Sequence, residues 1–176
     1  MADFRIARQE RLLSSFVFDV DRITVEGDET FERDVVRHPG AVAVVAVNEH
    51  GDVALLRQWR ATIGREHLEI PAGTCDVATE NPLATAQREL DEEIGAVSTQ
   101  WTELCTFYNS PGWTDQVTVV FLAENVSLRQ ARPSGPEEEA MRVEWWNRTE
   151  ILELLSPGSH LDGTATIGLR AWLALR

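Results

Sequence analysis

Cysteine is scarce in this sequence, and long apolar runs are missing. The two cysteines, Cys75 and Cys105, are too few for a disulfide framework and form no zinc-binding pattern. No stretch approaches the roughly 18 consecutive apolar residues of a membrane-spanning helix, and the first residues lack the basic and apolar regions of a signal peptide. We therefore expect a soluble, cytoplasmic protein with no membrane partner.

Basic residues are also in short supply. Sixteen lysine and arginine residues stand against 29 aspartate and glutamate residues, which gives a formal net charge of −13 at pH 7. Such a chain repels phosphate backbones and anionic lipids, so nucleic acid and membrane surfaces are disfavoured as partners. Clustered carboxylates would instead suit divalent cations. The length of 176 residues suits one domain, or one domain with a small appendage.

The N-terminal residues predict a β-hairpin in front of the main domain. Residues 12–25 are rich in β-branched and aromatic side chains and predict a strand, which a turn at 26–29 joins to a second strand at 31–37. The His-Pro-Gly sequence at 38–40 interrupts this pattern. We therefore expect an extension over residues 1–38 and one main domain over residues 39–176.

Strands and helices alternate in the main domain. The apolar run 41–47 predicts a buried strand that pairs with 53–59 as a hairpin, and a helix is predicted over 82–94, with Asn81 as its N-cap and Gly95 at its end. The other predicted elements are strands near 67–70, 101–108, 116–123 and 143–146, an exposed loop over 125–139, a helix from the Asn147 cap to Leu155, and a last helix after Asp162. This mixture predicts an α/β or α+β fold.

Two carboxylates of the helix predicted at 82–94 lie one turn apart. Glu89 and Glu93 follow the flank of its apolar face, whereas Glu92 lies nearer to solvent. Stacked carboxylates at the margin of a core repel each other unless a cation lies between them, and Mg²⁺ prefers oxygen ligands. Taken alone, such a pair is more typical of a solvated acidic face.

The residues around this helix favour the metal site. Gly73 precedes the helix, and from Glu80 to Gly95 the sequence reads glutamate, seven residues, Arg-Glu-aliphatic-x-Glu-Glu-x-Gly. This pattern resembles the Nudix box. Six residues rather than the usual five separate Gly73 from Glu80, and the closing aliphatic position is Ala96, but the extra loop residue alters no carboxylate spacing. By resemblance, Glu80 and Arg88 would mainly hold the loop and the helix together.

The resemblance implies an α/β/α sandwich around a mixed sheet, and hydrolysis of a nucleoside diphosphate linked to another group. Carried over by position, Glu89 and Glu93 would be the main Mg²⁺ ligands, with Glu92 close by and the backbone carbonyl of Ala72 as a further ligand. Mn²⁺ is the expected substitute. Divalent cations suit this reaction because they neutralise the diphosphate, stabilise the leaving oxygen and make a water nucleophilic.

Three further segments resemble the ADP-ribose pyrophosphatase subfamily of Nudix hydrolases. The strand-like segment 68–73 contains Glu69, and Pro111 lies sixteen residues past Gly95. Arg60 ends an Arg-Gln-Trp-Arg segment that is similar to a Gln-aromatic-Arg segment whose arginine contacts the diphosphate in that subfamily. Because the three occur in order around one box, the resemblance implies substrate contacts from Glu69, Arg60 and Pro111.

The N-terminal extension is also similar to that subfamily, although more loosely. In the subfamily this piece exchanges with a second subunit and helps to hold the adenosine end of the substrate, which implies a homodimer. Arg33, seven residues before Gly40, matches a substrate-contacting arginine. Phe16 or Phe18 could stack on adenine, although core packing is the role that we expect first for either ring.

The general base is expected in the loop before the strand at 143–146, because the subfamily carries a catalytic glutamate there. Glu137, Glu138 and Glu139 all qualify, and Glu139 could instead be an additional metal ligand. The spacing does not choose among the three. If none of them is the base, Glu124 and Asp115 are the next candidates.

The resemblance thus implies Mg²⁺-dependent hydrolysis of ADP-ribose to AMP and ribose 5-phosphate. Two alternatives stay open: a Nudix hydrolase of another nucleotide sugar such as GDP-mannose, and a binding module that senses ADP-ribose without hydrolysis. The intact Glu89, Glu92 and Glu93 argue against the binding module, because a sensor could lose them.

Overall fold

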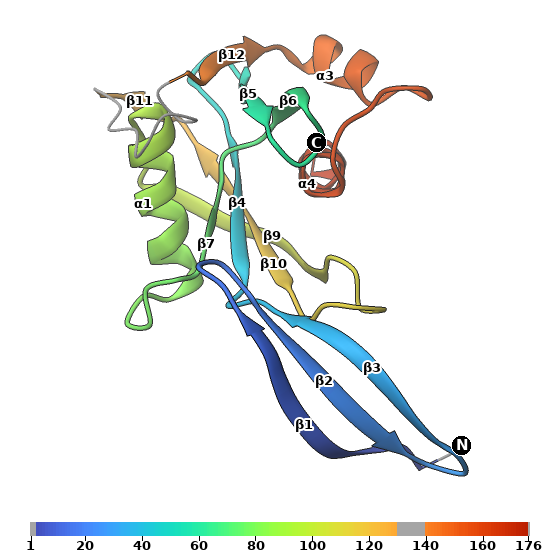
Figure 1. The fold of residues 1–176 in the computed structure, drawn as a ribbon. Helices are drawn as coiled ribbons and strands as arrows, with labels where there is room; N and C mark the ends of the chain where they lie inside the picture. Colours follow the sequence, from blue (N-terminus) through green and yellow to red (C-terminus); the bar gives the residue numbers. More distant parts are fainter. Residues whose placement is uncertain (1–2, 130–139, 176) are drawn as a thin grey trace. The chain divides into compact units, whose positions relative to one another are not determined.

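Figure 1 shows the computed structural model of the chain, which describes residues 3–129 and 140–175. The chain forms two compact units. The first contains residues 1–40 and 107–117, and the second contains residues 41–106 and 118–176. Each unit has its own β-structure and its own set of polar contacts.

The first unit contains an antiparallel sheet in the order β1-β2-β3. Its strands are β1 (Arg5–Ser14), β2 (Asp19–Glu26) and β3 (Thr30–Arg37). The predicted hairpin is present as β2 and β3, but residues 12–25 are not one strand. A turn divides them, because the Ser15 hydroxyl accepts from the Phe18 N–H over 3.2 Å and the Ser15 N–H donates to the Phe18 carbonyl over 3.0 Å. The residues before this turn pair with β2 as a third strand.

Residues 107–117 complete the first unit. Val36 of β3 forms a parallel bridge with Thr114, and its N–H donates to the Trp113 carbonyl over 2.8 Å. This segment is therefore attached to the last strand of the N-terminal sheet, although the two are far apart in the sequence.

The second unit is built on a mixed sheet in the order β7-β4-β10-β9. Its strands are β7 (Ala72–Thr74), β4 (Ala41–Ala46), β10 (Val117–Glu124) and β9 (Gln100–Tyr108). The central strands β4 and β10 are parallel, and β7 pairs antiparallel with β4. Strand β4 is buried on both faces, which its uninterrupted apolar sequence predicts. The predicted mixed sheet is confirmed.

A second, antiparallel sheet has the order β12-β5-β6. Its strands are β12 (Arg142–Trp146), β5 (Val53–Arg60) and β6 (Arg65–Glu69). The expected hairpin of 41–47 with 53–59 is wrong in its pairing, because β4 and β5 belong to different sheets. The backbone groups of β5 are taken up by β12 and β6, and an isolated bridge between Val47 and Val53 joins the two segments.

Two short strands, β8 (Ala96–Val97) and β11 (Ser127–Leu128), pair antiparallel. Residues 127–128 are therefore a strand, within a segment that the sequence predicts as a loop over 125–139. Residues 130–139 of that segment lie outside the described residues.

The three described helices are those that the sequence predicts: α1 (Pro82–Ile94), α3 (Arg148–Leu154) and α4 (Gly163–Ala174). Their predicted N-caps, Asn81, Asn147 and Asp162, each accept a backbone N–H of the first turn, and Asn147 with Glu150 forms a capping box. None of the helices in residues 3–129 and 140–175 is long and apolar enough to cross a membrane.

Helices α1 and α4 cover opposite faces of the mixed sheet (Figure 1). Leu90 of α1 belongs to one buried cluster with Val42 and Val44, which share a face of β4. Gly168 of α4 lies against the other face, where a Cβ atom would be 3.0 Å from Ile70 and 3.4 Å from Val45. This glycine lets α4 approach the sheet closely, so the sheet forms the middle of three layers.

Candidate active site

Capping residues fix the position of α1, the helix that carries the predicted metal ligands. The Asn81 side chain accepts a hydrogen bond from the Ala84 N–H over 2.9 Å, and Pro82 occupies the first helical position, where no N–H is required. Gly95 ends the helix with a φ of 61°, in the left-handed region that favours glycine, and its N–H donates to the Asp91 carbonyl over 3.0 Å. Local contacts therefore determine where the helix begins and ends.

Glu93 joins α1 to strand β7. The residue is 8% exposed, and its carboxylate accepts a hydrogen bond from the backbone N–H of Ala72 over 3.1 Å. Carboxylates that accept backbone N–H groups form short, strong hydrogen bonds, so this contact orients a buried acid. The structure thus brings together two of the predicted metal-binding residues.

Gly73 makes room for Glu89. A Cβ atom on Gly73 would lie 2.0 Å from Glu89 Cδ and 2.3 Å from its Oε1, so any other residue would displace this carboxylate. The Glu89 side chain is 13% exposed, and burial raises the pKa of its carboxyl group. The first glycine of the box therefore has a steric role next to a predicted metal ligand.

Arg88 lies at the centre of an acidic cluster. Its guanidinium pairs with four carboxylates, at distances of 2.8 Å to Glu89, 3.0 Å to Glu92, 3.2 Å to Glu80 and 3.4 Å to Asp76. Glu80, on the loop before the helix, is thereby tied to α1, as the resemblance predicts. Four carboxylates around one arginine leave an excess of negative charge beside α1.

The chemistry of this cluster suits a hard divalent cation. Glu89, Glu92 and Glu93 offer carboxylate oxygens, which are the ligands that Mg²⁺ and Mn²⁺ prefer, and a cation would offset the excess of negative charge. In residues 3–129 and 140–175, no group of three His, Cys, Asp or Glu side chains is already gathered into a metal site. The carboxylates are instead directed at Arg88 and at the Ala72 N–H.

A second polar group of the same unit contains two of the predicted substrate contacts. The Arg60 guanidinium donates to the Glu69 carboxylate from Nε over 2.8 Å and from Nη2 over 2.6 Å, and Gln58 donates to the same carboxylate over 3.3 Å. The fork-to-fork geometry holds the guanidinium in one orientation. Gln58 was not singled out from the sequence, although its spacing from Arg60 places both on one face of β5.

Two further predicted contacts, Arg33 and Pro111, lie in the first unit and line one pocket of about 440 Å³. The rings of Tyr108 and Trp113 line it too, and both residues are more than half exposed. The Arg33 guanidinium also lies over the ring of Phe31, 4.6 Å from its centroid. This pocket therefore combines a cation with aromatic surface. Tyr108 and Trp113 were not identified from the sequence, which carries no local signal for them.

The two phenylalanines considered for adenine stacking lie at the turn between β1 and β2. Phe16 is fully exposed and Phe18 is 39% exposed, so neither packs in a core of this structure. The expected core packing is therefore wrong for both rings in the single chain. Both rings line a second pocket of the first unit, of about 340 Å³, together with His38 and Pro39.

The expected general bases, Glu137, Glu138 and Glu139, lie outside the described residues. Asp115, one of the two next candidates for the base, already accepts hydrogen bonds from other residues. Its carboxylate accepts from Arg37 Nη1 over 3.0 Å and from the His38 N–H over 3.0 Å.

Comparison with known proteins places these features in a family. The model of the NUDIX domain matches residues 37–164. The chain is 36% identical to an ADP-ribose pyrophosphatase from Mycobacterium tuberculosis, over 96% of this chain and 83% of the relative. It is 37% identical to an ADP-ribose pyrophosphatase from Bacillus subtilis, over 92% of this chain and 88% of the relative.

A solved structure described as an ADP compounds hydrolase has the same fold. It matches with a TM-score of 0.82 at 19% identity and covers 98% of this chain and 93% of its own. The matched NUDIX region contains the mixed sheet, the sheet of β12, β5 and β6, helix α1 and the whole box from Gly73 to Gly95. On the family match and on both relatives, the chain belongs to the Nudix hydrolase family.

Proposed function

We propose that this enzyme hydrolyses ADP-ribose to AMP and ribose 5-phosphate with Mg²⁺, for which Mn²⁺ can substitute. The observation that carries the proposal is the set of acids on α1, where Glu89 and Glu92 pair with Arg88 and Glu93 accepts the Ala72 N–H. A hydrolase needs these acids, whereas a module that only binds ADP-ribose does not. The relatives named ADP-ribose pyrophosphatase support the choice of substrate.

In the proposed reaction, a water oxygen attacks one phosphorus of the diphosphate, and the bond from that phosphorus to the bridging oxygen breaks. The bridging oxygen leaves with the other phosphate, and the water proton passes to a carboxylate. Glu89, Glu92, Glu93 and the Ala72 carbonyl would hold the cation, which neutralises the diphosphate and activates water when bound. Arg60, held in orientation by Glu69, would bind the diphosphate oxygens.

The pocket of about 440 Å³ in the first unit is proposed for the nucleoside end of the substrate. Arg33 and Pro111 line it, and the exposed rings of Tyr108 and Trp113 offer flat surfaces on which a base can stack. Phe16, which is fully exposed, remains a proposed contact to adenine in an assembled dimer.

We propose that residues 1–38 are an extension exchanged between the subunits of a homodimer, in front of a Nudix domain over 39–176. All residues of β1 are exposed in the single chain, among them Ile6, Leu12 and Leu13. Exposed apolar side chains on an edge strand favour burial against a second copy. Light scattering at micromolar concentration should give twice the chain mass of 19.7 kDa. A monomer would refute the exchange and any role of Phe16 across subunits.

The general base is proposed among Glu137, Glu138 and Glu139. Changing the base to glutamine should lower kcat by about 10²–10⁴ with KM nearly unchanged, and the loss should shrink at high pH, where hydroxide is available. Loss of a metal ligand should instead raise the Mg²⁺ concentration that half-maximal activity requires. If all three variants keep full activity and the wild-type pH profile, the base lies elsewhere.

The substrate is tested by turnover rates with Mg²⁺, measured side by side for ADP-ribose, GDP-mannose, NADH and an oxidised nucleoside triphosphate. We expect the highest kcat/KM for ADP-ribose. A higher value for GDP-mannose would instead assign a nucleotide sugar with another base, and tight binding of ADP-ribose without turnover would assign a binding module.

Both cysteines, Cys75 and Cys105, are free in the structure, which fits the reducing cytoplasm proposed for this enzyme.

A further inference from the structure

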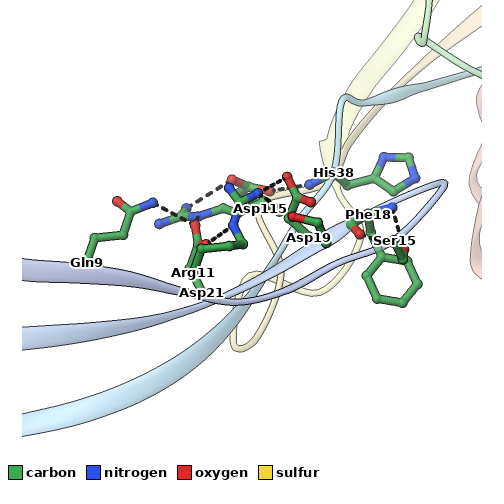
Figure 2. Close-up of polar contacts among 10 residues, drawn as sticks. Gln9, Arg11, Ser15, Phe18, Asp19, Asp21, His38 and Asp115 are labelled. Carbon is green, nitrogen blue, oxygen red and sulfur yellow. Dashed lines mark hydrogen bonds and ion pairs between the residues drawn. The ribbon is translucent and has the colours of Figure 1, made fainter.

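A buried carboxylate gathers three side chains at the N-terminal sheet. Asp21 of β2 is 1% exposed and accepts hydrogen bonds from Gln9 over 2.6 Å, from Arg37 Nε over 3.2 Å and from Arg11 Nε (Figure 2). Arg11 also pairs with Asp19. Asp21 is therefore a buried charge, whereas the ion pair of Arg22 with Asp34 in the same sheet joins two exposed side chains.

Arg37 extends this network to the segment 107–117. While its Nε faces Asp21, its Nη1 donates to Asp115 over 3.0 Å. The second oxygen of Asp115 accepts from the His38 N–H over 3.0 Å, and the Asp115 N–H donates to the Val36 carbonyl over 3.3 Å. One guanidinium therefore bridges a buried acid of the sheet and an acid of the segment through two nitrogens held in one plane.

The segment that Asp115 anchors supplies one wall of the pocket proposed for the nucleoside. Pro111 and Trp113 lie on it, while Arg33 lines the pocket from β3. Arg33 and Arg37 are four residues apart on β3 and therefore point to the same face of the strand. Arg37 and Asp115 line the same pocket, so the ion pair lies beside the proposed contacts rather than at a remote point of the sheet.

We propose that Arg37 and Asp115, supported by Asp21, are positioning residues that hold the segment 107–117 in the conformation that binds the nucleoside end of the substrate. The inference rests on the proposed function. A ligand that needs one conformation of a segment binds more weakly in proportion to the time that the segment spends elsewhere. The alternative is that the network only stabilises the sheet.

The test compares Asp115→Asn and Arg37→Lys with the control Asp34→Asn. Asp34 is also an arginine-paired aspartate of this unit, but its partner is the exposed Arg22 and it does not line the pocket. Isothermal titration measures the binding of AMP, which carries the base, and of ribose 5-phosphate, which does not. Steady-state kinetics with ADP-ribose and the thermal midpoint of each folded variant complete the set.

We expect Asp115→Asn and Arg37→Lys to raise the dissociation constant of AMP and the KM for ADP-ribose about tenfold, with kcat and the binding of ribose 5-phosphate nearly unchanged. Lysine should fail because it lacks the two nitrogens, held in one plane, with which Arg37 contacts Asp21 and Asp115. Asp34→Asn should leave all values unchanged. Unaltered AMP binding, equal weakening of both products, or an equal effect of Asp34→Asn would overturn the inference.

A fall in kcat at constant KM for Asp115→Asn would also overturn it, and would make Asp115 a candidate base. The proposed function is contradicted by a different result, namely wild-type enzyme that does not hydrolyse ADP-ribose.

Discussion

The two units each gather carboxylates around arginine, but in different proportions. On α1, Arg88 alone faces four carboxylates, and burial raises the pKa of Glu89. On the N-terminal sheet, Arg11 and Arg37 face Asp19, Asp21 and Asp115, and the hydrogen bond from Arg11 is the main reason that the pKa of Asp21 is lowered. A cluster with one arginine for four carboxylates is suited to receive a further cation, whereas two arginines for three carboxylates come close to charge balance and hold structure together.

The largest expected effect tests the acidic cluster directly. Glu89→Gln and Glu93→Gln each remove one charged oxygen, and we expect kcat to fall by about 10²–10³ because charge stabilisation of the diphosphate is lost. Asp91→Asn, on the same helix but outside the pairs formed with Arg88, is the matched control and should keep wild-type turnover. Near wild-type activity of either glutamate variant at saturating Mg²⁺ would show that the ligand assignment is wrong.

A smaller effect is expected from the glycine that accommodates Glu89. In Gly73→Ala, the new Cβ would lie 2.0 Å from Glu89 Cδ, so the carboxylate must move. We expect kcat/KM to fall about 10–100-fold and the Mg²⁺ concentration for half-maximal activity to rise, since the ligand is displaced rather than removed. Gly163→Ala, where a Cβ meets nothing within 4 Å, is the control. An unchanged Mg²⁺ requirement in Gly73→Ala would exclude the steric role.

The difference between the cluster on α1 and the network of the N-terminal sheet also explains what the sequence could predict. The caps of α1 depend on residues close together in the chain, so the boundaries of the helix follow from local pattern. The contact of Arg88 with Glu80 was predicted through the resemblance to the Nudix box, and the steric role of Gly73 was not predicted. The pairing of β5 and the network of Asp21 depend on contacts between distant segments. Asp115 meets Arg37 across 78 positions, and no periodicity or motif announces such a meeting.

The last and smallest effect concerns stability, where amide substitutions in the two clusters should have opposite signs. In metal-free protein at pH 7, Asp21→Asn should lower the midpoint of thermal unfolding by several degrees, because two arginines lose a buried charged partner. Glu89→Gln should raise the midpoint, because it removes a carboxylate whose ionised form burial disfavours.

The pH dependence of these two midpoint differences sharpens the test. The folded-state pKa of Asp21 is lowered, so its contribution is present above the usual aspartate value of about 3.9 and is lost as pH falls through the folded-state pKa. The folded-state pKa of Glu89 is raised, so its penalty is present at neutral pH and disappears as pH falls towards about 4.3. The gain of Glu89→Gln should therefore vanish at a higher pH than the loss of Asp21→Asn. Added Mg²⁺ should reverse only the difference between wild type and Glu89→Gln, since a cation that binds the folded state stabilises wild type more than this variant. A loss of stability in both variants at pH 7 without Mg²⁺ would contradict the comparison. It would mean that the carboxylates of α1 stabilise the fold without a bound cation, as those of the sheet do.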